Sequence, residues 1–278
     1  MPTEPFVQKL GKKVVSTPWD HSSHDEFLEY YAEKSIRPAQ LQHFRSVKKA
    51  ILRVLDQSKG AGHKYDVLDI GCNAGGQCSV WAEDNHRVHG LDINEPLLEL
   101  ARNRAAEAKQ EIDYRLGSAT RLPWPDESMD GCIALELLEH VEDWRSCVRE
   151  FVRVLRPGGV LFLSTTNTLC PRQHEFNLPL YSWYPRLLKR HFERLAFTTR
   201  PDLANYAKYP AVNWFSPYSL GAELARQGLN TRDRFDVVDT ANKSRAAKLI
   251  ITSIRALPPL RFLAHVCTPS TSLLGIRK

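Results

Sequence analysis

The sequence has no pair of cysteines spaced to form a structural zinc site. Six cysteines are scattered over 278 residues, and the spacing Cys-x-x-Cys does not occur. A structural zinc cluster is therefore not expected, and a chain of this length does not need disulfides to stabilise a core. We expect reduced thiols, as in a cytoplasmic protein.

Long hydrophobic runs and clusters of basic residues are also missing. No window approaches the roughly 18 apolar residues of a membrane-spanning helix, and the first residues lack the apolar stretch of a signal peptide. Lys and Arg give a net charge of +6, but they occur at most in pairs such as Lys12–Lys13. This dispersed excess argues against a nucleic-acid partner. It is compatible with a generally basic surface, or with one anionic ligand or membrane.

From Tyr65 onward, short apolar runs alternate with helical patterns. This alternation predicts an α/β fold in which parallel strands are joined by right-handed crossovers. The strands are expected at 65–71, 87–91, 112–116, 131–135 and 160–165, with helices at 79–85, 96–110 and 144–155. A helix at 218–227 and two further strands, at 234–239 and 272–276, are expected to follow.

Two segments depart from this alternation. Residues 1–60 are expected to form an N-terminal helical cap, with a loop at 1–20 and a helical pattern over 24–57 that Pro38 divides. Residues 167–216 are rich in aromatic residues and prolines, which suits a lid over a ligand site, a small satellite core, or both. We therefore divide the chain into the cap, 1–60, and one domain, 61–278, that contains the insertion 167–216.

A glycine-rich turn follows the first strand, in the sequence VLDIGCNAGG at 67–76. Its glycines, Gly71 and Gly75 among them, allow a tight turn and let backbone N–H groups approach a ligand. The second strand ends in Asp92, whose carboxylate can accept hydrogen bonds from both hydroxyls of a ribose. Asp69, just before the turn, would repel a pyrophosphate and suits a ligand with an ammonium group. This charge favours a cationic adenosyl cofactor over the dinucleotide of a dehydrogenase.

These segments together resemble the class I S-adenosylmethionine-dependent methyltransferases. GSATRLPWPDESMDGCIALELLEHV, at 117–141, resembles their adenine-binding stretch and fourth strand. LRPGGVLFLST, at 155–165, resembles their turn into the fifth strand. The resemblance covers 65–167 and, more loosely, 217–278. It implies a Rossmann-like fold with a seven-stranded, mostly parallel sheet flanked by helices, and S-adenosyl-L-methionine as the cofactor.

The resemblance also assigns cofactor-binding residues. It implies that Gly71 and Leu135 contact the cofactor, that Ser118 and Ala119 lie at the adenine, and that an N-terminal arginine reaches the methionine carboxylate. Arg37 is the candidate for that arginine, and Arg45 competes with it. Asn73 stands where the family usually has Gly and must adopt that backbone geometry, while Ser118 stands where Asp is common. The resulting set is Asp69, Gly71, Asn73, Gly75, Asp92, Ile93, Ser118, Ala119, Leu135 and Arg37.

Two carboxylates and a histidine follow the fourth strand, at Glu136, Glu139 and His140. On one face of a helical turn they can bind a divalent metal such as Mg²⁺, His140 can act as a general base, or the group can brace the loop. The pattern resembles the ubiquinone-biosynthesis O-methyltransferases, where it is linked to a divalent metal beside a catechol-like substrate. The catalytic candidates are His140, Glu136 and Asn167, and the metal candidates are Glu136, Glu139 and His140.

The acceptor is expected to be a small molecule. Methyl transfer from a sulfonium requires an aligned and nucleophilic acceptor, and the aromatic insertion suits a ring-shaped or lipid-like one. We expect S-adenosylmethionine-dependent transfer to a small hydrophobic or aromatic acceptor, with oxygen as the preferred atom. Methylation of nitrogen or carbon, and a non-catalytic S-adenosylmethionine-binding regulatory protein, are the alternatives.

Basic and apolar residues are mixed near the C-terminus, in KSRAAKLIITSIRALPPLRFL at 243–263. Such a segment can form an amphipathic helix at a membrane surface, or a helix packed on the sheet. The expected location is therefore the cytoplasm, with peripheral membrane contact through 243–263 as an open alternative.

Overall fold

The computed structural model describes residues 25–60, 62–204 and 211–278. The loop expected at 1–20 lies outside these residues, as do Tyr206 and Tyr209 of the insertion. The expected division of residues 24–57 is confirmed, because α1 (Asp25–Lys34) ends before Pro38 and α2 (Pro38–Lys59) begins with it. A proline at the first helical position has no hydrogen bond to lose, which explains the boundary.

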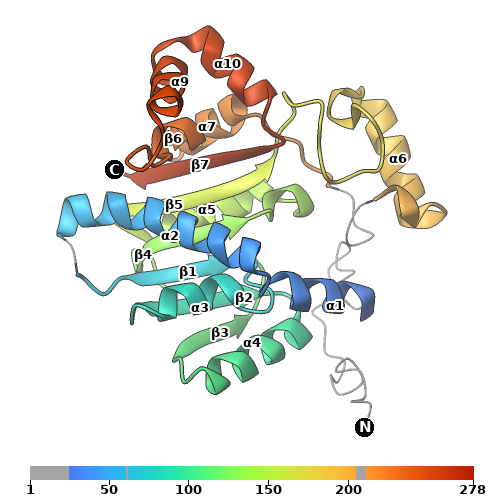
Figure 1. Cartoon of the computed structure of the whole chain (residues 1–278). Helices are drawn as coiled ribbons and strands as arrows, with labels where there is room; N and C mark the ends of the chain where they lie inside the picture. The colour runs from blue at the N-terminus through green and yellow to red at the C-terminus, as the bar shows by residue number, and fades with distance from the viewer. Residues whose placement is uncertain (1–24, 61, 205–210) are drawn as a thin grey trace.

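Seven strands form one sheet in the order β3-β2-β1-β4-β5-β7-β6 (Figure 1). Four neighbouring pairs, from β3 to β5, are parallel, and β7 runs antiparallel to both β5 and β6. The expected seven-stranded, mostly parallel sheet is confirmed. The strands are β1 (Asp66–Ile70), β2 (Arg87–Asp92), β3 (Ile112–Leu116), β4 (Met129–Leu135), β5 (Leu155–Thr166), β6 (Leu229–Asp233) and β7 (Ser270–Arg277).

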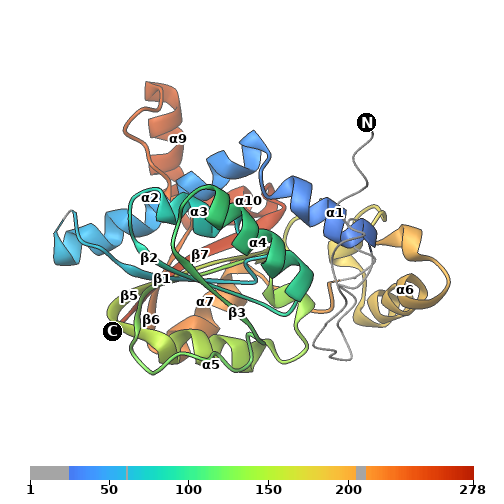
Figure 2. The ribbon, with the colours of Figure 1, turned by 90° about the horizontal axis from the view of Figure 1, so that it is seen from below.

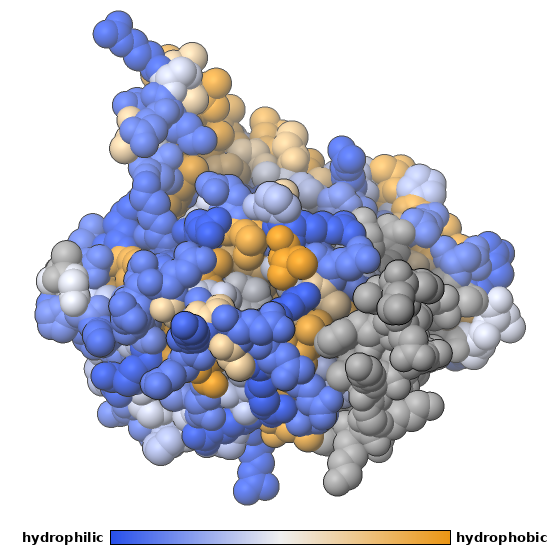
Figure 3. All heavy atoms as spheres, turned by 60° about the horizontal axis from the view of Figure 1, so that its bottom comes forward, coloured by the Kyte–Doolittle hydropathy of each residue, from blue (hydrophilic) through white to orange (hydrophobic). Residues whose placement is uncertain are grey.

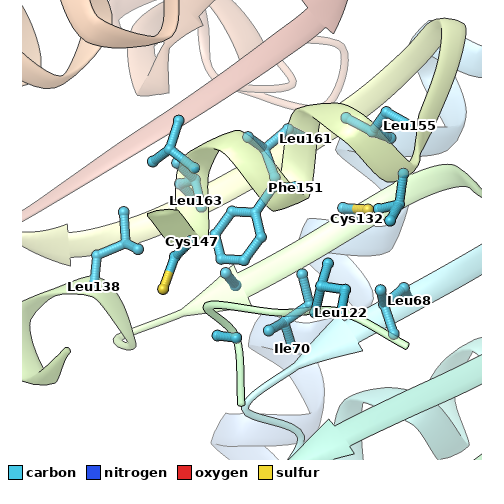
Figure 4. Close-up of a cluster of buried hydrophobic side chains, with 14 of the residues drawn as sticks. Leu68, Ile70, Leu122, Cys132, Leu138, Cys147, Phe151, Leu155, Leu161 and Leu163 are labelled. Atoms are coloured by element: carbon cyan, nitrogen blue, oxygen red, sulfur yellow. The ribbon is translucent and has the colours of Figure 1, made fainter. Parts of the chain in front are cut away.

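Helices cover both faces of the sheet (Figure 2). The first face carries α2, α3 (Gly76–Ala82) and α4 (Glu95–Glu107), and the second carries α5 (Trp144–Val154) and α7 (Pro217–Arg226). Successive residues of β1 point to opposite faces, so Val67 packs with Ile51 of α2, while Leu68 packs with Phe151 of α5. Figure 4 shows the second of these cores between α5 and the sheet. The two cores hold the strands in place and so fix the positions of the loops at their carboxyl ends.

The C-terminal part departs from the expected pattern at one strand. The strand expected at 234–239 is wrong, because β6 ends at Asp233 and α8 (Arg234–Val237) follows. The Asp233 side chain accepts hydrogen bonds from the backbone N–H groups of Phe235 and Asp236 and so caps this short helix. Two further helices, α9 (Arg245–Ala256) and α10 (Pro258–Val266), precede β7.

The insertion packs around a hydrophobic cluster of its own. It contains α6 (Arg186–Thr198) and two short 3-10 helices, η3 (Tyr181–Trp183) and η4 (Pro201–Leu203). The Tyr181 ring is completely buried and stacks on Phe176 with their centroids 4.1 Å apart. The satellite core is therefore present. Asn213 ties the insertion to the main domain. Its backbone carbonyl accepts a hydrogen bond from the Thr166 hydroxyl of β5, and its side-chain amide donates to the carbonyls of Leu138 and Val141 after β4.

Candidate active site

The turn after β1 has the backbone geometry that its sequence requires. Gly71 and Gly75 have φ values of 77° and 78°, and Asn73 has a φ of 48°. The Asn73 side-chain amide donates to the carbonyl of Gly71 at 3.0 Å, which stabilises this left-handed conformation. Asn73 thus adopts the left-handed backbone conformation at a position where the family usually has Gly. The turn delivers the chain directly into α3, which begins at Gly76 rather than at the expected residue 79.

Replacing Gly75 by Ala is expected to destabilise the protein by about 3 kcal/mol, through left-handed strain and overpacking. A Cβ atom at this position would overlap the Tyr114 hydroxyl and lie 2.9 Å from the Ala101 Cβ atom. Urea unfolding measures the change. The matched control is Gly158→Ala, because Gly158 has a similar φ of 75° and open space around it. Equal losses in both variants would contradict the packing argument.

Asp92, at the end of β2, connects the turn to the second strand. Its carboxylate accepts hydrogen bonds from the backbone N–H groups of Asn73 at 2.8 Å and Asn94 at 2.9 Å. The side chain is nearly buried, yet it borders an open cavity at the carboxyl ends of the strands. A fixed carboxylate in this place is suited to bind the hydroxyl groups of a ribose.

The cavity brings together predicted residues from four separate segments. It lies at the carboxyl ends of β1, β2 and β4. Strands β2 and β3 are added on one side of β1, and β4 and β5 on the other; ligands of α/β folds usually bind at this point of the sheet. Other residues of the cavity, not predicted from the sequence, are Leu91, Gly117, Thr120, Leu137, Val141, Glu142 and Asp143. The predicted residues that line it are Gly71, Asp92, Ile93, Ser118, Ala119 and His140.

Asp69 and Leu135 lie behind this cavity. The Asp69 carboxylate is buried 3.6 Å from the Cys78 thiol, and Leu135 packs against the core under α2. Burial, together with the nearby charge of Asp92, raises the pKa of Asp69 to about 7. A cationic ligand close to this carboxyl group would favour its ionised form.

The arginine candidates do not line the cavity. Arg37 lies at the start of α2, with its side chain 57% exposed and 3.4 Å from Glu33, and Arg45 pairs with Glu83 at the surface. Arg104 of α4 was missed by the sequence interpretation. Its guanidinium donates to the Ser35 hydroxyl at 2.9 Å and to the carbonyls of Ala32 and Ala74. Arg104 thereby holds α1 against the glycine-rich turn.

Three carboxylates converge after β4. Glu136 adopts a φ of 48°, a strained conformation for a residue other than Gly, and Glu139 follows in the 3-10 helix η2 (Leu138–His140). Glu175 of the insertion joins them, so that carboxylate oxygens of all three lie within 4.8 Å of one another. Glu139 is completely buried and accepts a hydrogen bond from the Thr165 hydroxyl at 2.8 Å. We call Glu136, Glu139 and Glu175 the carboxylate cluster.

Positive charge only partly compensates the carboxylate cluster: Lys34 acts on Glu175, and Arg234 lies close enough to interact with Glu136. Burial, then repulsion from Glu136 and Glu175, raises the pKa of Glu139, and burial with the charge of Glu136 raises the pKa of Glu175 to about 7. Among the described residues, the second carboxylate oxygen of Glu139 has no hydrogen-bond donor. Such a cluster either retains a proton near neutral pH or binds a cation.

His140 lies beside the carboxylate cluster rather than within it. Its Nε2 atom is 4.0 Å from a Glu175 oxygen, and Glu175 takes the third place that the sequence interpretation gave to His140. Burial and the charge of Lys34 lower the pKa of His140 to about 4, so the imidazole is neutral at physiological pH. Glu175 was missed because it lies in an irregular segment far from the Glu136–His140 motif in sequence.

Asn167 does not face the cavity. It is completely buried, and its side-chain amide donates to the carbonyls of His265 at 2.9 Å and Thr268 at 2.7 Å. Its side-chain oxygen accepts from the backbone N–H of Leu169. All its polar atoms are therefore used to hold the end of β5 against the end of α10, and we remove Asn167 from the catalytic candidates.

A methyltransferase-domain family matches residues 68–163, which contain the glycine-rich turn, Asp92 and the Glu136–His140 motif. Residues 68–163 thus form a methyltransferase domain, in agreement with the resemblance to the class I S-adenosylmethionine-dependent methyltransferases. S-adenosylmethionine is the cofactor of this family, and Asp92, Ser118 and Ala119, where its ribose and adenine are expected, line one cavity.

Two ubiquinone biosynthesis O-methyltransferases are similar to the methyltransferase. The protein from Idiomarina loihiensis is 38% identical over 102 residues, which cover 36% of this chain and 42% of that protein. The protein from a Chelativorans species is 31% identical over 186 residues, covering 64% of this chain and 66% of that protein. The chain thus matches less than half of the first relative's length.

The fold is shared with solved structures at low sequence identity. The PH0226 protein from Pyrococcus horikoshii OT3 aligns with 92% of the methyltransferase and 100% of its own chain, at a TM-score of 0.53 and 15% identity. This similarity concerns the fold alone.

Proposed function

We propose that the methyltransferase transfers a methyl group to an oxygen atom of a small hydrophobic or aromatic acceptor. One observation carries the proposal: His140 lines the same cavity as Asp92, Ser118 and Ala119. An acid–base group and the cofactor-binding residues thus share one space. The O-methyltransferase names of the two relatives support oxygen as the methylated atom.

The chain's own residues supply acceptor activation. The bound cofactor supplies an electrophilic methyl group on a sulfonium, so the protein must position a nucleophile in line with it. The imidazole of His140 is neutral at physiological pH and has a nitrogen lone pair that can accept the proton of a hydroxyl group, provided that a nearby negative charge offsets the burial that lowers its pKa. Glu175, 4.0 Å from that ring, can stabilise the positive charge that proton transfer places on His140.

The carboxylate cluster fits a divalent cation. Three convergent carboxylates, one of them fully buried with an unused oxygen, are a donor set that Mg²⁺ or a similar hard cation accepts. Glu136, Glu139 and Glu175 would hold the cation, which would lower the pKa of a hydroxyl group on the acceptor. Phe176, next to Glu175, is buried in the hydrophobic cluster of the insertion, which fixes the segment that carries Glu175.

The decisive experiment is an acceptor screen with isotopically labelled S-adenosylmethionine. Purified protein is incubated with hydroxylated aromatics and lipids, with matching amines as a second set, and products are identified by mass. We expect label in methyl ethers of catechol-like compounds, and loss of turnover with EDTA that Mg²⁺ restores. Label in amine products alone would overturn oxygen transfer, and tight cofactor binding with no product in either set would favour the regulatory alternative.

Cofactor affinity is expected to depend on pH through Asp69. Because the pKa of this carboxyl is raised to about 7, it is largely protonated at pH 6, and the cofactor's ammonium favours the ionised form. Affinity should therefore rise by up to about tenfold per unit as pH approaches 7 and then level off, while the ammonium stays protonated. Calorimetry between roughly pH 5.5 and 7 tests this. Asp69→Asn should remove the dependence, and an unchanged slope in that variant would show that another group titrates.

A further inference from the structure

The α9–α10 hairpin, residues 245–266, projects from the sheet next to β6 and β7 (Figure 1). Within the described residues, no single helix is long and apolar enough to cross a membrane. The two helices reach that length and composition only together, and the chain bends by 110° between them. The sequence left open whether this segment packs on the sheet or lies on a membrane surface.

The α10 helix has its polar side turned inward. The Arg261 guanidinium donates to Asp233 at 2.7 Å and also pairs with Asp236, and the buried His265 ring lies 2.8 Å from the same Asp233 carboxylate. An ordinary surface helix buries its apolar side. In α10 the apolar side chains remain exposed instead, by 39% at Leu260, 45% at Phe262 and 56% at Leu263.

The α9 helix is exposed as well. None of its side chains is buried, and Leu249 and Ile250 are 68% and 59% exposed. Figure 3 shows hydrophobic side chains along one side of the arm that α9 forms and hydrophilic ones along the other. Ordinary packing on the sheet therefore does not account for the apolar residues of either helix. We call Leu249, Ile250, Leu260, Phe262 and Leu263 the apolar face of the hairpin.

Charge identifies the occupant of this face. The sequence contains no Asp or Glu after Asp239, while Lys243, Arg245 and Lys248 are exposed at the start of the hairpin. A second copy of the chain would bring these cations against one another. An anionic membrane surface complements them and also accepts apolar side chains at the boundary between headgroups and acyl chains.

We propose that the α9–α10 hairpin docks on an anionic lipid bilayer, with its apolar face in the interfacial layer and its cations at the lipid phosphates. The Asp233 contacts with Arg261 and His265 fix α10 in the orientation that presents the apolar face. The Asn167 amide anchors the end of α10 to β5, next to the strand ends that carry the site. Docking of the hairpin does not depend on the proposed acceptor.

Vesicle sedimentation with the whole protein tests the proposal. The probes are phosphatidylcholine vesicles and vesicles in which phosphatidylglycerol is mixed with phosphatidylcholine. We expect binding to the anionic vesicles only, and release at high salt. Leu249→Ser and Leu263→Ser should each lower the partition coefficient about tenfold. Lys248→Glu should lower it about fivefold or more.

Two matched substitutions outside the hairpin serve as controls. Leu187→Ser removes an exposed leucine of α6, 78% accessible, and Lys64→Glu removes an exposed cation near the start of β1. Neither should change vesicle binding, and circular dichroism checks that all variants are folded. Equal binding to neutral vesicles, or loss in Leu187→Ser but not in Leu263→Ser, would overturn the proposal. A dimer that Leu263→Ser dissociates, with no vesicle binding, would identify a second copy as the occupant instead.

Discussion

Replacing Asp92 by Ala is expected to weaken S-adenosylmethionine binding by at least about 100-fold. The carboxylate accepts hydrogen bonds from the backbone N–H groups of Asn73 and Asn94, so its removal frees the glycine-rich turn. It also removes the group that is expected to bind the ribose hydroxyls. Hydrogen bonds to charged groups contribute about 1.5–3 kcal/mol each, and two of them account for this factor or more. Isothermal titration calorimetry with S-adenosylmethionine and S-adenosylhomocysteine measures the change.

A nearby aspartate provides the control for this prediction. Asp113 lies on the neighbouring strand β3, where its carboxylate pairs with Arg115 and His89 outside the cavity. Asp113→Ala should therefore retain the affinity of the unsubstituted protein. If Asp92→Ala also retained it, the ribose would have to bind elsewhere, and the placement of the cofactor along β2 would be wrong.

Replacing Glu139 by Gln is expected to lower turnover by about 1000-fold while leaving cofactor affinity unchanged. Gln keeps an oxygen that can accept a hydrogen bond from the Thr165 hydroxyl, but it removes the negative charge that a metal in the carboxylate cluster would require. Loss of kcat without a change in S-adenosylmethionine affinity separates acceptor activation from cofactor binding. Initial rates with the acceptor found in the screen, together with calorimetry, give both quantities.

The Thr165 hydrogen bond can be removed separately. Thr165→Val keeps the Glu139 carboxylate and removes only the hydroxyl group that donates to it at 2.8 Å. It should therefore lower turnover much less than Glu139→Gln does. Comparable losses in the two variants would mean that the position of the Glu139 side chain, rather than its charge, is what matters. Full activity of Glu139→Gln would remove the carboxylate cluster from the mechanism.

Sequence reasoning succeeded where a signal is local. The turn geometry at Gly71, Asn73 and Gly75 follows from residues that tolerate positive φ, and the strands of the parallel half are short apolar runs. It failed at 234–239, where an apolar pattern was interpreted as a strand. There Asp233 and Asp236 form a helix cap, so a local polar signal was present and was overlooked.

The residues that were missed depend on contacts between distant segments. Glu175 joins Glu136 and Glu139 only because the insertion folds back onto η2, and nothing in its sequence surroundings indicates this. Arg104 reaches α1 from α4 across the glycine-rich turn. The sequence also could not show the direction of the Arg37 side chain. Arg37 was the candidate for binding the methionine carboxylate, but its side chain points to the surface and pairs with Glu33. Three-dimensional folding, and not residue type, decides these roles.

The position of β7 has a consequence for the order of folding. This strand is made after β6 but lies between β5 and β6, and within the described ranges β6 pairs with no other strand. During synthesis, β5 and β6 must therefore wait with unpaired edges until residues 270–277 are available. Exposed strand edges favour aggregation, and pairing between segments so far apart in sequence is slow. We expect truncated chains that lack β7 to aggregate, even though they already contain the glycine-rich turn and the carboxylates of Glu136 and Glu139.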